Sequence, residues 1–159
     1  MREPEWCLRA MPTFIHSKLS KFFLEIVSGG GSAGSPDLTD LSTYCDEVSM
    51  PEELELVETT TFGSTSKTYL VGFADGQISI SGNWDRTLAG YLGELKEAFR
   101  DGTVQSVTFQ YAPEGNDTGD HYYTGEVVLV NYEKNSAVKD QVKFSAEFQI
   151  TGPVTETTY

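Results

Sequence analysis

The chain has 159 residues, of which 38% are hydrophobic and 12% aromatic, so it suits one globular domain with a real hydrophobic core. Its formal net charge is −13 at pH 7, and a strongly negative surface repels phosphate backbones, which argues against nucleic-acid binding. No apolar run approaches the roughly 20 residues that a membrane-spanning helix needs. The stretch MREPEWCLRA contains Glu3 and Glu5 and has no apolar segment, so we do not expect a signal peptide there.

The negative charge is unevenly distributed along the chain. Between Phe22 and Ser66 there is no lysine or arginine. The acidic residues in that interval are Glu25, Asp37, Asp40, Asp46, Glu47, Glu52, Glu53, Glu55 and Glu58. One part of the surface is therefore expected to be strongly acidic, and the simplest role of such a surface is solubility.

Residues 1–12 are expected to form an extension or arm ahead of the main domain. Met11 and Pro12 read like a second start, so the first ten residues are either an upstream extension or an ordered arm. Cys7 and Cys45 fit neither a metal-binding spacing nor a disulfide framework. We expect two free thiols, with a bridge between them as the alternative.

The first part of the chain predicts short strands separated by turns. Residues 18–27 are rich in β-forming residues and place Phe22, Leu24 and Ile26 on one face. The glycine- and serine-rich segment 28–36 is expected to be a turn or loop. Further strands are expected at 53–60, at 68–73 and, ending near Val48, within 37–50.

Asp75 and Gly76 form a dipeptide that is typical of tight turns, so we expect the chain to reverse there. The following residues alternate between apolar and polar. Ile78, Ile80 and Trp84 share one face, which predicts a half-buried strand.

One α-helix is predicted, at about 86–100. Asp85 is suited to the N-cap, and Gly102 to the left-handed position after the last turn. Gly90 and Gly93 are poor helix formers that allow close packing against a sheet. The apolar stripe of the helix consists of Leu88, Leu92, Leu95 and Phe99, at spacings of 4, 3 and 4.

Three more strands complete the chain, at 103–111, 122–133 and 141–151. Gly152 and Pro153 are expected to end the last strand, leaving residues 154–159 as a polar tail. The predicted fold is mainly β: a sandwich or barrel of two packed antiparallel sheets flanked by the one helix. The domain is expected to span residues 13–153.

The sequence offers little chemistry. Neither His16 nor His121 lies at a metal-ligand spacing from another histidine or a cysteine, and the cluster of Asp117, Asp120 and His121 is typical of a solvated turn. No activated nucleophile, phosphate-binding loop or EF-hand spacing is present. We therefore expect no enzyme activity, no cofactor and no metal.

The segment 51–73 is long, polar in its middle and rich in threonine. Thr59, Thr60, Thr61, Phe62 and Gly63 are candidates for an edge that pairs with another chain, because extended backbone offers unpaired N–H and C=O groups. The alternative from the residues alone is an ordinary internal hairpin.

Taken in order, several motifs resemble the tail tube (major tail) proteins of long-tailed bacteriophages, the siphophages. The resemblance runs from about residue 13 to residue 155. The motifs are DLS at 40–42, ETTTFG at 58–63, KTY at 67–69, ISISGNWD at 78–85, YTG at 123–125 and VKFSAEFQITG at 142–152.

The resemblance implies two packed β-sheets with one flanking helix, and hexameric rings that stack into a hollow tube. It also implies that one sheet of each subunit joins its neighbours in a continuous barrel around the lumen. A long loop and the terminal arms link one ring to the next; here the arms correspond to the N-terminal segment and residues 154–159. The expected ring and subunit contacts in the loop are Glu58, Thr59, Thr60, Thr61, Phe62, Gly63, Lys67 and Tyr69.

The resemblance also implies partners and a location. The lumen holds a tape measure protein before genome delivery, DNA then passes without specific binding, and the tube meets tail terminator and distal tail proteins. Assembly takes place in the host cytoplasm, and the product belongs to the virion tail, without a membrane. An acidic lumen would repel phosphates, so we expect acids of the segment above or of the strands 122–133 and 141–151 to line it.

Three alternatives remain. A tube of a contractile tail or secretion system shares the fold. Another virion β-sandwich, a tail completion or capsid decoration protein, is a further structural alternative. A carbohydrate-binding module would use stacking rings, for which the candidates are Trp6, Trp84, Tyr122 and Tyr123.

Overall fold

The computed structural model describes residues 16–26, 37–61 and 65–159, and the elements along them are mainly β-strands. A short 3₁₀ helix precedes the first strand, and one α-helix lies mid-chain. The elements in order are η2 (Ser17–Leu19), β1 (Lys21–Glu25), β2 (Leu38–Asp40), β3 (Cys45–Ser49), β4 (Glu52–Glu58), β5 (Tyr69–Asn83), α1 (Arg86–Arg100), β6 (Val107–Ala112), β7 (His121–Asn135) and β8 (Lys143–Thr158).

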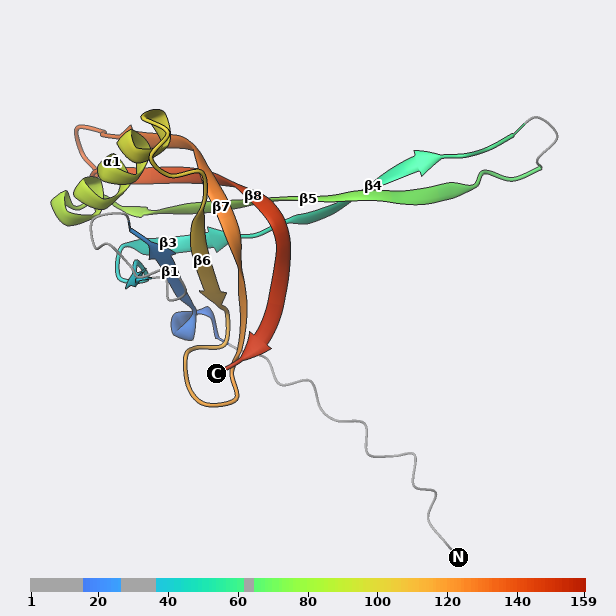
Figure 1. The fold of residues 1–159 in the computed structure, drawn as a ribbon. Coiled ribbons are helices and arrows are strands. Elements are labelled where there is room, and N and C mark those ends of the chain that lie inside the picture. The colour runs from blue at the N-terminus through green and yellow to red at the C-terminus, as the bar shows by residue number, and fades with distance from the viewer. Residues whose placement is uncertain (1–15, 27–36, 62–64) are drawn as a thin grey trace, which may run out of the picture.

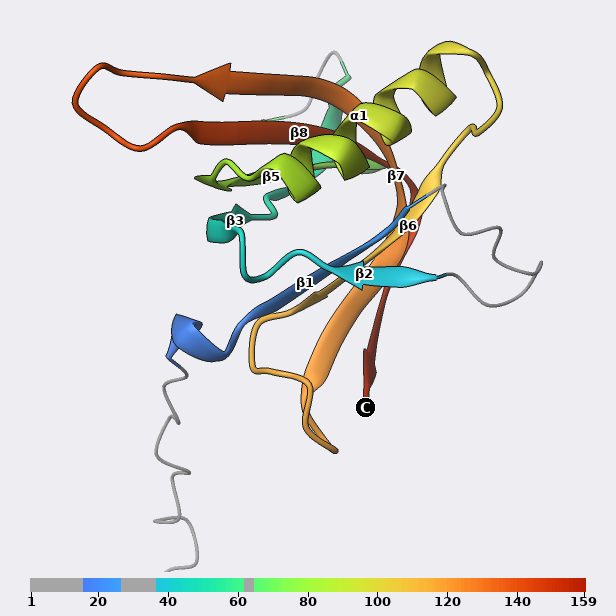
Figure 2. The same ribbon diagram turned by 90° about the vertical axis from the view of Figure 1, so that its left-hand side faces the viewer.

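The strands form one continuous antiparallel path in the order β2-β1-β6-β7-β8-β5-β3, and β4 pairs with β5 away from this path (Figure 1). The long strands β7 and β8 pass through a bend, where their pairing shifts register between Thr124 and Glu126 and again between Leu129 and Asn131. Figure 2 shows the two parts of the sheet facing different ways on either side of the bend. The fold is mainly β and antiparallel with one helix, as predicted, and the two expected sheets are two halves of one bent sheet.

We name the two halves by their strands. The first half contains β2, β1, β6, residues 121–127 of β7 and residues 150–158 of β8. The second half contains residues 129–135 of β7, residues 143–149 of β8, residues 77–83 of β5 and β3.

Both halves and the helix share one hydrophobic core. The alternation predicted for β5 is confirmed, because Ile78 and Ile80 are buried. β8 follows the same rule. The buried core residues are Phe22, Leu24, Ile26, Leu41, Ile78, Ile80, Leu88, Leu92, Leu95, Val107, Phe109, Val127, Phe144, Ala146 and Phe148.

The helix α1 has the bounds that its sequence predicts. Asp85 caps it, since its Oδ1 accepts a hydrogen bond from the Thr87 backbone N–H at 2.7 Å. Gly102 follows the helix at φ 72°, in the left-handed region that favours glycine. The expectation that Gly90 and Gly93 pack closely on a sheet was wrong: a Cβ at either position would meet nothing within 4 Å.

The turn predicted at Asp75 and Gly76 was wrong, because β5 continues without a break from Tyr69 to Asn83. Both residues are extended and pair with β4, in the register Glu53↔Asp75 and Glu52↔Gly76. Gly76 is small for a different reason than a turn. A Cβ there would lie 3.0 Å from Cδ1 of Ile150.

The end predicted for the last strand at Gly152 and Pro153 was also wrong. β8 continues to Thr158, and Thr155 pairs with Thr124 beyond an irregularity that spans the Gly-Pro pair. Gly152 has φ 87°, so the pair forms a bulge, one of the sites in a sheet where proline is tolerated. Residues 154–158 are therefore part of the sheet rather than a free polar tail. Residues 1–12, including Cys7, lie outside the described residues.

Candidate assembly surface

The most prominent surface feature is a two-stranded arm that leaves the body of the protein (Figure 1). It consists of β4 and residues 69–76 of β5, and we call the described residues 52–61 and 65–76 the projecting hairpin. Among the described strands β4 pairs with β5 alone. At its base, Nε2 of Gln149 donates to Oδ1 of Asp75 at 2.6 Å and to the Gly76 carbonyl at 3.0 Å, which ties the hairpin to β8.

Several of the predicted contact residues meet beyond the end of β4. The Thr59 backbone N–H donates to the Thr68 carbonyl at 2.8 Å, and the Thr68 N–H donates to Oγ1 of Thr60 at 3.3 Å. Nζ of Lys67 lies 3.2 Å from Oε2 of Glu58. These polar contacts join the two segments of the hairpin beyond the paired part of β4 and β5. The structure thus brings Glu58, Thr59, Thr60 and Lys67 together.

The other predicted contact residues divide into two groups. Tyr69 opens β5 opposite Glu58, and Thr61 is exposed beyond β4. Phe62 and Gly63 lie outside the described residues.

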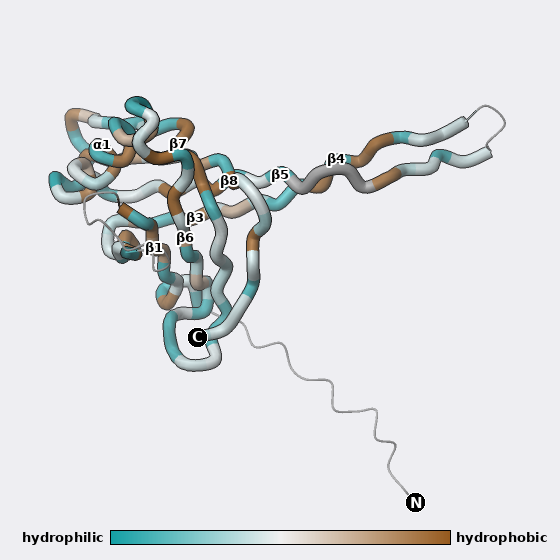
Figure 3. Tube along the Cα trace, in the orientation of Figure 1, coloured by the Kyte–Doolittle hydropathy of each residue, from teal (hydrophilic) through white to brown (hydrophobic). Residues whose placement is uncertain are grey.

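Sequence reasoning missed exposed apolar residues where β4 pairs with β5. We call this paired part of the hairpin, residues 54–58 and 69–71, the stem. Leu54, Leu56, Val57 and Leu70 are 63%, 60%, 46% and 63% exposed, and Tyr69 is 51% exposed. Figure 3 shows hydrophobic stretches on both strands of the hairpin, well away from the body. The available signal was the pair Leu56-Val57, since adjacent strand residues point to opposite faces and cannot both face one core.

A second surface is the side of the second half that faces away from the core. Its side chains alternate with buried residues of β5 and β8 and are short, polar or acidic. We call it the polar face. It consists of Glu47, Ser49, Gln77, Ser79, Ser81, Asn131, Glu133, Ser145, Glu147 and Gln149.

Acids dominate the charge of the polar face, because the cation at its margin is already paired. Nζ of Lys143 lies 2.7 Å from Oδ2 of Asp46, and the Ser81 hydroxyl donates to Oδ1 of Asp46 at 3.3 Å. The hydrogen bond from Lys143 lowers the pKa of Asp46, so this carboxylate stays ionised at neutral pH. The carboxylates of Glu47, Glu133 and Glu147 have no ion-pair partner among the described residues.

The second half also ends in two unpaired strand edges. Within the described residues β3 pairs with β5 on one side only, and residues 129–135 of β7 pair only with β8. Such edges carry free backbone N–H and C=O groups that accept another strand.

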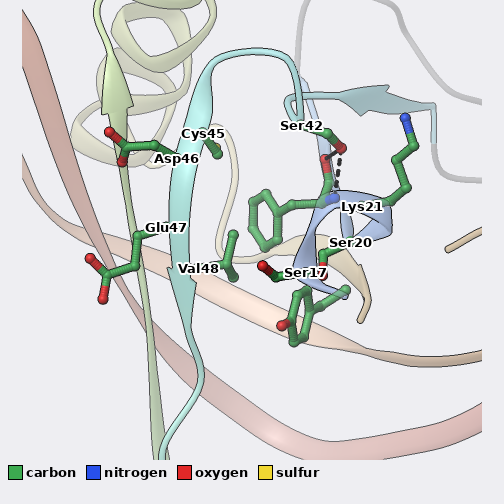
Figure 4. A pocket seen from close by; sticks show the side chains of 10 residues that line it. Ser17, Ser20, Lys21, Ser42, Cys45, Asp46, Glu47 and Val48 are labelled. Carbon is green, nitrogen blue, oxygen red and sulfur yellow. Dashed lines mark hydrogen bonds between the residues drawn. The ribbon is translucent and has the colours of Figure 1, made fainter. Parts of the chain in front are cut away.

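A cleft of about 250 Å³ lies between η2, β1 and β3 (Figure 4). Ser42 bridges its walls, because its Oγ accepts from the Phe22 N–H at 2.9 Å. Cys45, a free thiol, lines the cleft, and its burial raises its pKa to about 12. The thiol is therefore protonated at neutral pH and is a poor nucleophile.

No other chemistry emerges from the part of the chain that the structure describes. It contains no group of three or more His, Cys, Asp and Glu side chains arranged to hold a metal ion. The Asp117–His121 turn is held by its own bonds: Oδ2 of Asp120 accepts from the Asp117 N–H at 3.0 Å, and Oε2 of Glu114 accepts from the His121 N–H at 3.0 Å. None of the described helices is long and apolar enough to cross a membrane.

Two of the aromatic residues proposed for sugar stacking make contacts within the chain, and Trp6 lies outside the described residues. Trp84 packs against the hydrophobic core. The Tyr122 ring contacts the Tyr159 ring, with centroids 4.5 Å apart. Contacts within the chain occupy both of these rings, which argues against their use in sugar stacking.

The comparisons with known proteins place the fold. The tail of an empty gene transfer agent (GTA) particle, solved with C6 symmetry, is similar with a TM-score of 0.68 at 15% sequence identity, covering 90% of this chain and 98% of that one. The SPP1 tail tube has a TM-score of 0.67 at 13% identity, over 91% of this chain and 80% of that one. A chain of the anti-feeding prophage baseplate has a TM-score of 0.66 at 9% identity, over 93% and 98%.

No family model matches the sequence, and no curated protein matches it either. The structural likeness therefore carries the comparison. The chain has the fold of phage tail tube proteins, which is the fold that its motifs resemble.

Proposed function

We propose that this chain is the tail tube protein of a long-tailed phage or of a phage-like particle, and that it assembles into stacked hexameric rings. The observation that carries the proposal is the projecting hairpin: a long arm with exposed apolar residues, on a fold that similar chains use in tails and tubes. An arm of this kind is a surface for association, because large apolar side chains on a soluble monomer favour burial against a partner.

The unpaired edges of the second half support a continuous barrel. β3 of one subunit meets residues 129–135 of β7 in the next, so that each ring closes without a free edge. The register of this junction follows from alternation, since it must keep the polar faces of both subunits on one side.

The polar face then lines the lumen. The acids Glu47, Glu133 and Glu147 give the bore a negative potential, which keeps DNA from adhering during passage. The side chains between these acids carry hydroxyl and amide groups, so the polar face presents no apolar patch to DNA that passes through the lumen. The proposed lumen surface thus contains specific acids, whereas the sequence alone indicated a choice of segments.

The remaining roles follow from the tube. The tip of the hairpin, from Glu58 through Lys67 and Tyr69, contacts the adjacent ring. The lumen holds a tape measure protein before DNA passes, and the ends of the tube meet tail terminator and distal tail proteins. The protein belongs to the virion tail after assembly in the host cytoplasm, and it has no enzymatic role. A tube of a contractile system is the second candidate, favoured by the likeness to the anti-feeding prophage chain.

Negative-stain electron microscopy of the purified protein tests the proposal. Regular rings or hollow tubes are expected, and a persistent monomer at high concentration would contradict it. Replacing residues 59–67 by a two-residue turn is expected to leave rings but abolish stacking. Gln105→Ala, an exposed substitution on the connection from α1 to β6, serves as the control and should form normal tubes.

The lumen assignment has a separate test. Glu133→Lys together with Glu147→Lys reverses two charges on the polar face and is expected to leave tubes intact, because both side chains are exposed. The variant tubes should retain labelled DNA at low salt and release it at high salt, as electrostatic binding requires. Wild-type tubes should not retain it. Equal retention of DNA by variant and wild-type tubes would contradict the assignment of the polar face to the lumen.

A further inference from the structure

The two strand edges of the second half carry acids on the same face. Glu47 of β3 pairs with Ser81 of β5. Glu133 of β7 pairs with Ser145 of β8, and Ser145 in turn pairs with Ser81. Directly paired residues point to the same side of a sheet, so both glutamates project from the polar face, one at each edge. Both are exposed and have no ion-pair partner among the described residues.

The barrel of the proposed tube brings these two edges together. Each strand of the second half is antiparallel to its neighbour in the order β3-β5-β8-β7, so β3 and β7 run in opposite directions. Rotation about the axis of a ring preserves the direction of a strand along that axis. β3 of one subunit therefore meets β7 of the next in the antiparallel manner of the rest of the sheet.

Alternation restricts the register of this junction. The polar faces of both subunits must lie on one side, so Glu47 meets a polar-face residue of β7. These residues are Asn131, Glu133 and Asn135. Opposite Glu133 the two glutamates are direct neighbours, with Cβ atoms about 5 Å apart, and in the other two registers they are diagonal neighbours at about 7–8 Å. The junction therefore brings Glu47 and Glu133 close together in each of these registers.

The described lysines nearest to this row of residues are not available to neutralise the two glutamates. Lys143 lies at the margin of the polar face, and its Nζ is 2.7 Å from Oδ2 of Asp46. Lys134 points to the other side of the sheet, since it pairs with the core residue Phe144. Within the described residues the polar face therefore brings no unpaired lysine or arginine to the junction.

Glu147 adds a third acid beside the junction. It pairs with Asn131 of β7, so it is a diagonal neighbour of Glu133. Like charges that face each other across paired strands are destabilising, and charged side chains on an edge strand discourage its pairing with another chain. The contact between the two edges is therefore opposed by an electrostatic repulsion that salt can screen.

We propose that Glu47 and Glu133 act as an electrostatic brake on the association of subunits, so that ring closure at low ionic strength is opposed by their mutual repulsion. The brake keeps the open strand edges of the free subunit from pairing at random. It makes the β3–β7 junction the step at which salt controls assembly. The inference rests on the proposed tube, because the two residues come together only when subunits form a ring.

Salt dependence and a neutral substitution test the brake. The Debye length is about 30 Å at 0.01 M salt and about 3 Å at 1 M, which is shorter than the separation of the pair. Light scattering and electron microscopy measure the protein concentration at which wild type begins to assemble, and this threshold should be several-fold lower at high salt. Glu133→Gln should lower the threshold several-fold at low salt and leave it unchanged at high salt.

A matched control removes the same charge elsewhere. Glu94 is exposed on α1, which packs on the core side of the sheet, opposite the polar face. Glu94→Gln should therefore assemble like wild type at both salt concentrations. If it lowers the low-salt threshold as much as Glu133→Gln does, the repulsion comes from net charge and the brake is wrong.

A charge-reversal cycle separates contact between the two side chains from net charge. Glu133→Lys places opposite charges across the junction, so this variant should assemble most readily at low salt. Adding Glu47→Lys makes both residues cationic and should restore slow assembly, although the net charge is then less negative still. If the double variant assembles more readily than Glu133→Lys alone, the proposal is overturned.

The behaviour of wild type separates the brake from the tube. Glu47 and Glu133 are exposed, so the thermal unfolding midpoint of each dissociated variant should match that of wild type, which checks folding. If wild-type tubes form at the same threshold concentration at low and high salt, the brake is wrong although the tube stands. If wild type forms neither rings nor tubes at any salt concentration, the proposed function itself fails.

Discussion

One strand passes through two regions that treat its apolar residues in opposite ways. In the body, β5 buries Ile78 and Ile80 in the core that also contains residues of β8 and α1. In the projecting hairpin, the same strand exposes Tyr69 and Leu70 by more than half. β-forming residues occur in both parts, so local propensity does not separate them. The two regions differ in what packs against them. Other elements of the chain bury the apolar residues of the body, whereas none of the described residues buries those of the stem.

From this difference we infer that the stability of the subunit and its proposed assembly depend on different parts of the molecule. A core substitution lowers the free energy of unfolding of each subunit. We expect a stem substitution to leave the subunit folded and to weaken contacts between subunits of the proposed tube. Each fully buried aliphatic or aromatic side chain contributes about 1.5–3 kcal/mol to stability. Burial of the exposed stem side chains against another subunit should contribute a comparable free energy for each side chain.

The sharpest contrast is expected between a core and a stem truncation. Phe109→Ala removes a fully buried ring at the centre of the core and should lower the free energy of unfolding by about 3–5 kcal/mol. Leu70→Ala, on the exposed stem, should change it by about 0.5 kcal/mol or less. Urea titration of the dissociated subunits measures both. An equal loss in the two variants would mean that the stem is covered within the subunit.

A second contrast uses glycines with and without neighbours. Gly82→Ala would place a Cβ 2.0 Å from the Tyr44 carbonyl oxygen, so the backbone of β3 must shift, at a cost of about 1–3 kcal/mol. Gly90→Ala on α1 meets nothing within 4 Å and should stabilise by up to about 1 kcal/mol. Thermal melting of both variants measures the change in the unfolding midpoint, which should be negative for Gly82→Ala and positive for Gly90→Ala. A neutral Gly82→Ala would show that β3 and β5 separate easily.

The helix cap gives a smaller effect. Asp85→Ala removes the acceptor of the Thr87 N–H and should cost about 1 kcal/mol. Asp85→Asn keeps an acceptor and should recover most of that loss. Because α1 covers the body and not the hairpin, assembly of the folded subunits should be unaffected. Denaturant titration and electron microscopy of both variants check the two statements.

The smallest effect is expected at the margin of the polar face. The pKa of Asp46 is lowered in the folded state, so its stabilisation is present above its unfolded pKa and is lost as the pH falls through its lower folded value. Because the pair with Lys143 is exposed, Asp46→Asn should cost less than about 1 kcal/mol at pH 7, and the cost should be smaller at pH 2. Titration at both pH values measures this. A cost that is the same at pH 7 and pH 2 would assign the effect to packing.

Much of the body was predictable from the sequence because its signals are local. Alternation placed Ile78, Phe144 and Phe148 in the core, and the 4-3-4 spacing with Asp85 set the bounds of α1. These patterns reflect burial and capping within one element. Counting charges indicated an acidic stretch between Phe22 and Ser66, but of the acids on the polar face only Glu47 belongs to it.

Tertiary structure decided the features that depend on pairing between distant segments. Asp75 and Gly76 lie in an extended strand because β4 pairs across them, and the Gly152-Pro153 pair is a bulge because β7 continues alongside. The sequence directed attention to the threonine-rich segment. Only the tertiary structure revealed the apolar stem beneath it, because exposure is a property of which chain lies next to a side chain, and that is absent from a linear pattern.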